Sequence, residues 1–336
     1  MFPAPDRPGL APDRAGARPP AVSVIIPTYN MSQFIGEALQ SAFAQTFRDF
    51  EVVVVNDGST DASDLEKAIE PYRSGLIYIQ QENRGCAAAR NTGIAAATGE
   101  LIALLDADEA WCPDFLARQV PPFAADPELA AFWCDGIVVG EGPLVGRRVM
   151  EYDPSVRPVT TEALLRGKVN PLTSGIVLRR QAVLDVGGFD ERFQRAEDFD
   201  LYLRLCHAGW KLDFQTVVLH RRRLHSRSLS YDKLNQLSSG MDVLRKFSAS
   251  VGESHRLQAT IQGCLRALQS EHSLECGRLH LRAGDYERAA EDYWRAYKYR
   301  KQFLLPAFVV VLKTCPRLAC RVRALRQRFL VSRAKS

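Results

Sequence analysis

The sequence contains no apolar run that is long enough to cross a bilayer. Its most apolar stretch, FLLPAFVVVL at residues 303–312, has ten residues and a proline, whereas a membrane-spanning helix needs about 20 residues. The N-terminal segment is rich in Pro, Arg and Ala and lacks the apolar core of a secretory signal. We therefore expect residues 1–20 to be a disordered leader and the protein to be cytoplasmic.

The cysteines lack the spacing of a metal site. No two of the eight are arranged as C-x-x-C, and no pair of histidines lies near them at zinc-ligand spacing, which argues against structural zinc. They are scattered through segments of apolar periodicity, as Cys206 is in LYLRLCHAGW. We expect buried, reduced thiols of a cytosolic protein.

Glycine is missing from the turn after the first predicted strand. The turn that begins at the last residue of VSVIIP is PTYN, whereas the dinucleotide-binding fingerprint requires glycines at that point. The segment GEGPLVG, from Gly140 to Gly146, has a different spacing and does not follow a strand that leads into a helix. The sequence therefore argues against a dehydrogenase.

Acidic residues are missing from the end of the chain. The whole sequence has 44 basic and 39 acidic residues, and residues 313–336 hold eight of the basic ones and none of the acidic ones. The body is thus faintly acidic, and the basic end, with Phe329 as its one aromatic residue, lacks the interleaved aromatic residues that stack on bases. We expect no nucleic acid partner.

The basic end has an amphipathic pattern. Four apolar residues recur at helical spacing, namely Leu318, Val322, Leu325 and Phe329. Residues 303–336 are therefore predicted to form an apolar–basic amphipathic tail, which suits peripheral contact with an anionic membrane at the inner face of the cytoplasmic membrane. The alternative is a solubilising helical end that packs on the body.

Strands and helices alternate from residue 21 onward. Strands are expected at VSVIIP, EVVVVND, LIYIQ and LIALLDAD, with helices at 31–44, at 61–72 and at GCAAARNTGIAAATG. This pattern predicts an α/β fold with a Rossmann-like, mostly parallel sheet and helices on both faces. Further strands at AAFWCDGIVVG, SGIVL and KLDFQTVVLH, and a helix at EDFDLYLRLCHAGW, extend the domain to residue 230.

The remainder predicts a C-terminal α-helical appendage over residues 231–302. Five residues have the spacing of one tetratricopeptide repeat, namely Gly277, Gly284, Ala289, Tyr293 and Ala296. One repeat cannot bury its own face, and no second copy is visible. We expect a single tetratricopeptide-like hairpin here.

Carboxylates follow the predicted strands, where ligands of such sheets bind. Asp106 and Asp108 lie two residues apart after the fourth strand, so on an extended segment they would project to one side and suit Mg²⁺ or Mn²⁺. Asp57 ends the second strand and could accept hydrogen bonds from a base or ribose. Arg90, in a helix of small residues, could bind a diphosphate or orient the carboxylates. Each feature alone also fits an ordinary turn or surface.

Three segments resemble the inverting glycosyltransferases of family 2, which have the A-type nucleotide-diphospho-sugar transferase fold. They are VSVIIPTYN with its continuation to NDGSTDAS, ENRGCAAARNTGI with LIALLDADE, and GGFDERF with EDFDLYLRL. The resemblance covers residues 21–230. It implies a metal-dependent transfer from a nucleotide sugar, expected to be a UDP-sugar, to a glycan or lipid-linked acceptor in cell-envelope or exopolysaccharide synthesis.

The resemblance also implies roles for single residues on the donor side. Nucleotide-sugar binding is implied for Pro27, Thr28 and Tyr29 at the base, Asp57 at the base or ribose, Arg90 near the nucleotide and Asp106 on the ribose side. The metal would be held by Asp108 and Asp106. His225 in LHRRRLHSRSLS would be a further metal or phosphate contact, in a looser match that also involves Arg223, Ser228 and Ser230. Glu109 stands where relatives often have Asp, and we do not expect it to be a ligand.

The catalytic pair implied by the resemblance is Glu197 and Asp198, with Asp198 as the general base that takes the acceptor proton. Carboxylates also belong in the first turn of a helix for electrostatic reasons alone. The competing hypothesis is a catalytically inactive nucleotide-sugar-binding or scaffolding protein that acts through its helical C-terminal part.

Overall fold

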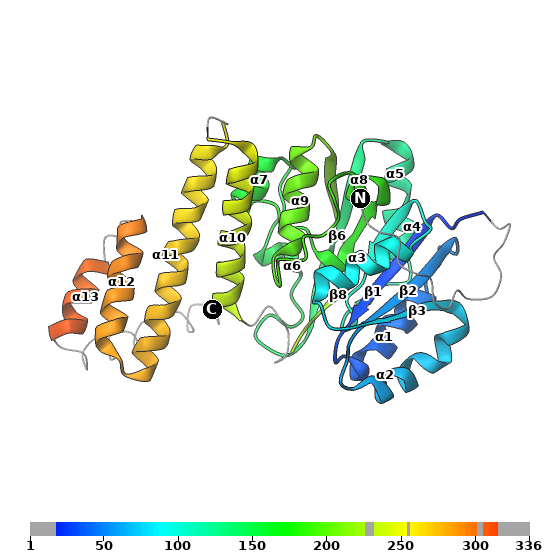
Figure 1. The fold of residues 1–336 in the computed structure, drawn as a ribbon, viewed down its shortest axis with the longest axis horizontal. Coiled ribbons are helices and arrows are strands. Elements are labelled where there is room, and N and C mark those ends of the chain that lie inside the picture. The colour runs from blue at the N-terminus through cyan, green and yellow to red at the C-terminus, as the bar shows by residue number, and fades with distance from the viewer. Residues whose placement is uncertain (1–17, 226–231, 254–255, 301–304, 315–336) are drawn as a thin grey trace. The chain divides into compact units, whose positions relative to one another are not determined.

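The computed structural model describes residues 18–225, 232–253, 256–300 and 305–314, and its internal contacts divide the chain after residue 231 into two compact units. Figure 1 shows a sheet with helices on both sides in the first unit and helices alone in the second. Most of the predicted leader lies outside the described residues. Within the described part of it, Arg18 Nη2 donates to Asp49 Oδ2 at 2.6 Å.

Eight strands form a single sheet in the order β3-β2-β1-β4-β7-β6-β8-β5. Their bounds are β1 (Val22–Thr28), β2 (Phe50–Asp57), β3 (Leu76–Gln81), β4 (Leu101–Leu104), β5 (Ala110–Trp111), β6 (Leu129–Gly140), β7 (Ile176–Arg179) and β8 (Lys211–Leu224). The strands from β3 to β4 pair in parallel, whereas β7 is antiparallel to both of its neighbours. The α/β prediction with a Rossmann-like sheet is confirmed, and the sheet is mixed in its second half.

The helices of the first unit connect these strands. They are α1 (Ser32–Phe43), α2 (Ala62–Ile69), η1 (Glu70–Gly75), α3 (Cys86–Ala96), α4 (Phe115–Gln119), α5 (Pro121–Ala125), α6 (Val149–Tyr152), α7 (Thr161–Leu165), η2 (Thr173–Gly175), α8 (Arg180–Asp185) and α9 (Glu197–His207). The second unit holds α10 (Lys233–Val251), α11 (Gln258–Ala283), α12 (Tyr286–Arg300) and α13 (Leu305–Thr314).

The central strands are apolar along their length because both of their faces are covered. All seven residues of β1 are buried. One face of β1 and β2 packs with residues of α1 and α2, and the other face of β2 packs with α3. The approach of α3 is close, since a Cβ added to Gly93 would lie 2.5 Å from Ile25 Cγ2. This packing holds the start of α3 beside the carboxyl ends of β1 and β2.

Two strand ends differ from the sequence prediction. The fourth strand ends at Leu104, so that Asp106 lies beyond it in a turn closed by the Glu109 N–H on the Asp106 carbonyl at 3.1 Å. The last strand continues to Leu224, because Arg221–Leu224 keep pairing with the end of β6. Residues 221–224, which follow the predicted strand KLDFQTVVLH, therefore belong to β8.

The expectation of buried cysteines is only partly correct among the described residues. All six cysteines among the described residues are free, and of these only Cys134 is fully buried. Burial raises the pKa of Cys134, so this thiol stays protonated. Cys315 and Cys320 lie outside the described residues.

The second unit contains the predicted helical hairpin, formed by α11 and α12. A Cβ added to Gly277 would lie 3.2 Å from the Tyr293 ring, which shows how closely the two helices approach. Helix α13 packs on this hairpin, with Val309 and Leu312 buried and the ring of Phe308 edge-on to Tyr293 at 5.1 Å. The apolar side of 305–314 is thus used for packing, and residues 315–336 lie outside the described residues.

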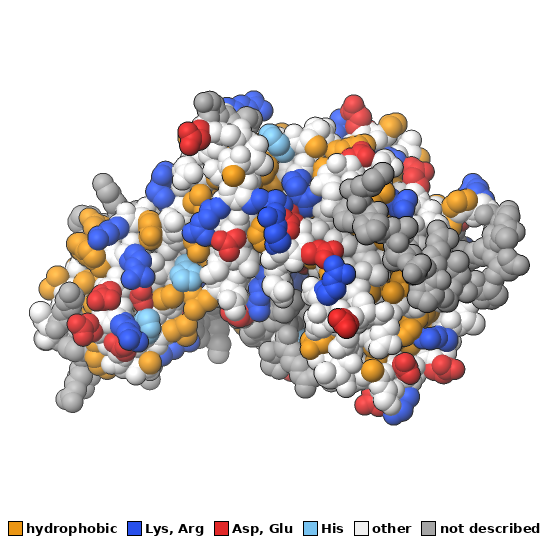
Figure 2. Space-filling view, viewed as in Figure 1, with side chains coloured by type: hydrophobic (Ala, Val, Ile, Leu, Met, Phe, Trp, Pro, Cys, Tyr) orange, Lys and Arg blue, Asp and Glu red, His pale blue; other side chains and the backbone are white. Residues whose placement is uncertain are grey.

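The surface of the second unit carries charges of both signs. Figure 2 shows Lys and Arg side chains alternating with Asp and Glu side chains on the face in view. Within the part of the chain that the structure describes, no helix combines the length and the apolar character needed to cross a membrane.

Candidate active site

The candidate site lies where the parallel strands end. Thr28 ends β1 and Asp57 ends β2, and in parallel strands these ends meet at one edge of the sheet. The two following loops are joined by Asn30, whose Oδ1 accepts hydrogen bonds from Thr60 N at 2.8 Å and Thr60 Oγ1 at 3.0 Å. Pro27 is buried within β1, whereas Tyr29 is 43% exposed. Of the three predicted base-pocket residues, Tyr29 therefore presents its ring at the surface.

Asp57 supports the loop that leads into α3. Its Oδ1 accepts from Gln81 Nε2 at 2.7 Å and from Arg84 N at 3.0 Å, and its Oδ2 accepts from Gly85 N at 2.8 Å. The carboxylate is buried, and Gly85 has a positive φ of 89° that favours glycine. Asp57 thus shapes the edge of the site through backbone N–H groups, and its predicted contact with the nucleotide stays a prediction.

Arg90 joins two carboxylates that are far apart in the sequence. Its Nη2 donates to Asp106 Oδ1 at 2.8 Å, and its Nη1 donates to Glu197 Oε1 at 2.5 Å. The Arg90 side chain is only 4% exposed, and its guanidinium lies 5.4 Å from the centre of the Phe189 ring. A buried guanidinium of this kind holds both carboxylates in defined positions. Two roles were considered for Arg90, namely binding a diphosphate and orienting the carboxylates. These contacts are of the kind that the second role requires.

Asp106 and Asp108 do not act on one common partner. Because the chain turns after β4, Asp106 faces Arg90, whereas Asp108 Oδ2 lies 2.9 Å from His225 Nε2. The segment is a turn and not the extended chain that was expected, and whether the two carboxylates share a ligand stays a prediction. The Asp106 backbone N–H is held by Ser174 Oγ at 3.0 Å.

The end of β8 forms the other wall of the site. The His225 ring stacks on the Phe34 ring with centroids 4.9 Å apart, and Arg223 Nε donates to the Asp108 carbonyl at 2.8 Å. Glu109 Oε2 lies 2.5 Å from His220 Nε2. The expectation that Glu109 is not a ligand stays a prediction. Ser228 and Ser230 lie outside the described residues.

The predicted catalytic pair begins α9. Glu197 and Asp198 lie in its first turn, where carboxylates are stabilised by the helix dipole. The preceding Ala196 has a φ of 59°, an unfavourable conformation for a residue with a Cβ. Asp198 Oδ2 accepts from Thr173 Oγ1 at 2.7 Å, and its Oδ1 accepts from Phe199 N at 2.7 Å.

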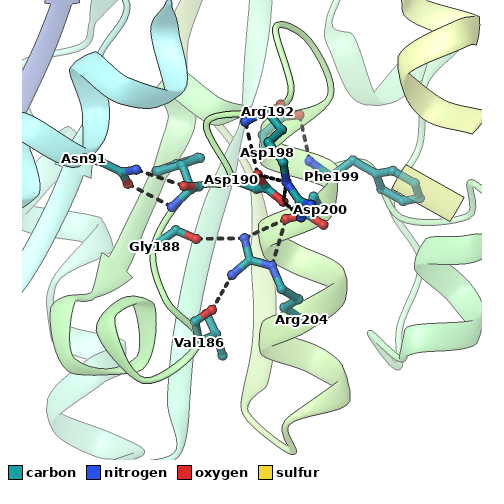
Figure 3. A network of polar contacts seen from close by, with 10 residues as sticks. Asn91, Val186, Gly188, Asp190, Arg192, Asp198, Phe199, Asp200 and Arg204 are labelled. Atoms are coloured by element: carbon teal, nitrogen blue, oxygen red, sulfur yellow. Dashed lines mark hydrogen bonds and ion pairs between the residues drawn. The ribbon is translucent and has the colours of Figure 1, made fainter. Parts of the chain in front are cut away.

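A polar network holds the loop before this pair, as Figure 3 shows. Asn91 Nδ2 donates to the Phe189 carbonyl at 2.8 Å, and Asn91 Oδ1 accepts from Phe189 N at 2.9 Å. Arg204 donates to the carbonyls of Val186 at 2.6 Å and Gly188 at 2.7 Å. Because the two side chains belong to α3 and α9, the loop is attached at both sides. It therefore presents the start of α9 in one orientation.

Glu197 has a strongly perturbed acidity. Burial raises its pKa to about 7, the charge of Asp198 raises it as well, and the Arg90 guanidinium opposes both effects. The charges of Asp106, Glu197 and Asp198 all act on this one guanidinium, so the group holds an excess of negative charge. Glu197 is thus able to bind a proton near neutral pH while Arg90 stays charged.

A divalent cation fits the chemistry of Asp108 and its surroundings. Burial raises the pKa of Asp108 to about 6, and the charges of Glu109 and Asp106 add to this effect. A cation would relieve this cost, and carboxylate oxygens with one imidazole suit Mn²⁺ or Mg²⁺. Within the described ranges, however, no three side chains of His, Cys, Asp or Glu converge on one point. For the predicted ligands Asp106, Asp108 and His225 to bind an ion, Asp108 and His225 would have to move apart.

Sequence reasoning did not identify Thr173 and Ser174, which contact Asp198 and Asp106. They lie in PLTSG, a short segment without helical or strand periodicity. The only signal was their place at the beginning of the predicted strand SGIVL, since Thr173 precedes it and Ser174 is its first residue.

The sequence matches family models and curated proteins that are glycosyltransferases. Residues 23–187 match the model of Glycosyl transferase family 2, and residues 149–254 match that of Glycosyltransferase like family 2. An uncharacterized glycosyltransferase of Rickettsia felis is 30% identical over 218 residues, which is 62% of this chain and 35% of that protein. The pre-mycofactocin glycosyltransferase of Mycobacterium tuberculosis is 31% identical over 225 residues, 62% of this chain and 46% of that protein. The chain thus spans less than half of the length of either relative.

Two solved structures share the fold. TarS of S. aureus, residues 1–349, in complex with UDP-GlcNAc, aligns with a TM-score of 0.58 and 19% identity over 87% of each chain. The mannosyltransferase PcManGT of Pyrobaculum calidifontis, in complex with GDP-Man and Mn²⁺, aligns with a TM-score of 0.60 and 22% identity over 94% of this chain and 86% of that one. Because the two family models match overlapping segments that together run from residue 23 to residue 254, the chain belongs to glycosyltransferase family 2.

Proposed function

We propose that this protein transfers a sugar from a UDP-sugar to an acceptor hydroxyl with inversion at the anomeric carbon, and that it requires Mg²⁺ or Mn²⁺. The observation that carries the proposal is the buried Arg90, which joins Asp106 at the donor side to Glu197 beside Asp198. A purely structural ion pair would not need two carboxylates on one buried guanidinium at the ligand-binding edge of a sheet.

On the donor side, the loops after β1 and β2 would hold the nucleotide. Tyr29 offers an exposed ring, and Asp57 orders the backbone at the start of α3. Asp108, with Asp106 and His225, would bind the metal ion, which when bound supplies positive charge to the departing diphosphate. TarS with UDP-GlcNAc and PcManGT with GDP-Man and Mn²⁺ support a nucleotide-sugar donor and a metal for this fold.

On the acceptor side, Asp198 would act as the general base. As the acceptor oxygen forms its bond to the anomeric carbon, its proton passes to a carboxylate oxygen of Asp198 and the bond to the diphosphate oxygen breaks. Glu197 would hold Arg90 in place beside this base. The acceptor class follows the resemblance, and we propose a glycan or lipid-linked hydroxyl of the cell envelope.

The experiment is a screen of UDP-sugars and GDP-sugars for thermal stabilisation of the protein with Mn²⁺ and with EDTA, followed by an assay for released nucleoside diphosphate. We expect stabilisation by at least one donor with Mn²⁺ and turnover of that donor. Stabilisation without turnover on any acceptor or water would favour the inactive, scaffolding alternative. If no nucleotide sugar binds, the proposal is wrong.

A further inference from the structure

A three-residue turn, η2 (Thr173–Gly175), contacts both halves of the proposed site. Thr173 Oγ1 donates to Asp198 Oδ2 at 2.7 Å, and Ser174 Oγ accepts from Asp106 N at 3.0 Å. The turn thus lies between the proposed general base and a carboxylate of the donor side, and it makes these contacts with two successive hydroxyl groups.

The turn itself is held from inside the protein. Trp111 Nε1 donates to the Ser174 carbonyl at 2.5 Å, and Gln119 Nε2 donates to the Gly175 carbonyl at 2.8 Å. Trp111 is 4% exposed and Gln119 is fully buried. Because these donors belong to the packed core, the two hydroxyl groups have little freedom to move.

The hydroxyl of Thr173 determines how the Asp198 carboxylate is oriented. The other oxygen, Oδ1, accepts only from Phe199 N of the same turn of helix among the bonds described above. That local bond moves with α9, so it does not fix the position of the Asp198 carboxylate relative to the sheet. The bond from Thr173 does fix it, because η2 leads directly into β7. Removing it would leave the carboxylate free to rotate about its side-chain bonds.

The surroundings of Thr173 match this role. Tyr202, which follows Asp198 by one turn of α9, is 1% exposed. Burial, and then the charge of Asp198, raises the pKa of Tyr202, so its hydroxyl stays protonated. Thr173 thus bonds Asp198 on a side where the neighbouring side chain is neutral.

We propose that Thr173 and Ser174 are positioning residues that set the proposed general base against the donor site, with Thr173 orienting Asp198 and Ser174 fixing the backbone of Asp106. This inference rests on the proposed function for the role of Asp198. The two hydroxyl groups act on different halves of the reaction, so loss of the Thr173 hydroxyl should lower kcat and loss of the Ser174 hydroxyl should weaken donor binding. A general loss of stability would not separate these two effects.

The test compares Thr173→Val, Thr173→Ser and Ser174→Ala in the full chain. The measurements are kcat and KM for release of nucleoside diphosphate from a UDP-sugar or GDP-sugar that the wild type uses, and Kd for UDP with Mn²⁺ by calorimetry. We expect Thr173→Val to lower kcat by about tenfold to hundredfold, because a displaced base loses about that much, with Kd unchanged. Thr173→Ser, which keeps the hydroxyl, should restore kcat. Ser174→Ala should weaken UDP binding by about tenfold, since the Asp106 N–H loses its acceptor.

Crystal structures of the Thr173→Val and Thr173→Ser variants supply a measurement that does not depend on activity. We expect the Asp198 carboxylate to rotate in the first variant and to stay in the second. An unmoved Asp198 in Thr173→Val, or a kcat within about twofold of the wild type, would overturn the inference. If the wild type binds no nucleotide sugar, the proposed function fails, and the position of Asp198 in the two structures still decides whether Thr173 orients it.

Discussion

Replacing Asp198 by asparagine tests the proposed base with little change in shape. The side-chain amide of the D198N variant would have one acceptor oxygen where the carboxylate has two. That oxygen can keep the bond from Phe199 N, while the NH₂ group donates to Thr173 Oγ1, since a hydroxyl can accept as well as donate. Both neighbours thus stay bonded, and we expect the D198N variant to fold.

The same substitution should not reduce stability above neutral pH. The charge of Asp198 helps to raise the pKa of Glu197 to about 7, so its removal lowers that pKa. A buried carboxyl with a raised pKa destabilises the fold at pH values above that pKa, and each unit of reduction returns about 1.4 kcal/mol. We therefore expect D198N to be at least as stable as the wild type at pH 8 in urea unfolding.

Turnover should fall steeply in this stable protein. Loss of a general base costs about 10² to 10⁴ in rate, or about 3 to 5 kcal/mol in barrier. Nucleoside diphosphate release measures kcat, and calorimetry with UDP and Mn²⁺ checks that donor binding stays near the wild-type value. A turnover within about tenfold of the wild type, about 1.4 kcal/mol in barrier, would refute the assignment of Asp198 as base.

Three further predictions concern charge. Between about pH 4.5 and pH 7 the folded protein keeps the Glu197 proton while the unfolded chain releases it, so the free energy of unfolding of the wild type falls by about 3 kcal/mol as the pH rises. The E197Q variant should not show this fall when its free energy of unfolding is measured at each pH. If the free energies of both proteins change with pH in parallel, the prediction is wrong. The D108A variant should lose Mn²⁺-dependent UDP binding in calorimetry, whereas E162Q, at an exposed ion pair with Arg166, should keep it; equal binding by both would remove Asp108 from the metal site. Deleting residues 315–336, which hold seven basic residues and leave the packed α13 in place, should release the protein from vesicles of anionic lipid without changing donor turnover, and equal vesicle binding by both forms would contradict the membrane prediction.

Local patterns in the sequence determined the elements of the first unit. Apolar strands such as VSVIIP and EVVVVND can be stable only between two covered faces, so the alternation with amphipathic helices predicted the layered sheet. The same periodicity located Asp57 at the end of β2 and the carboxylates in the first turn of α9, because these positions depend on the chain a few residues to either side. The family resemblance rests on these local segments.

Tertiary packing decided which of these groups meet. Arg90 and Glu197 are 107 positions apart and become a buried pair only because the fold brings a residue of α3 to the start of α9. The chain turns after β4, so Asp106 and Asp108 face different partners, a result that their spacing could not predict. Thr173 lies in a segment without periodicity, and its contact with Asp198 exists because η2 is held in the core. Contacts between distant segments depend on how complete layers pack, and no local pattern records that arrangement.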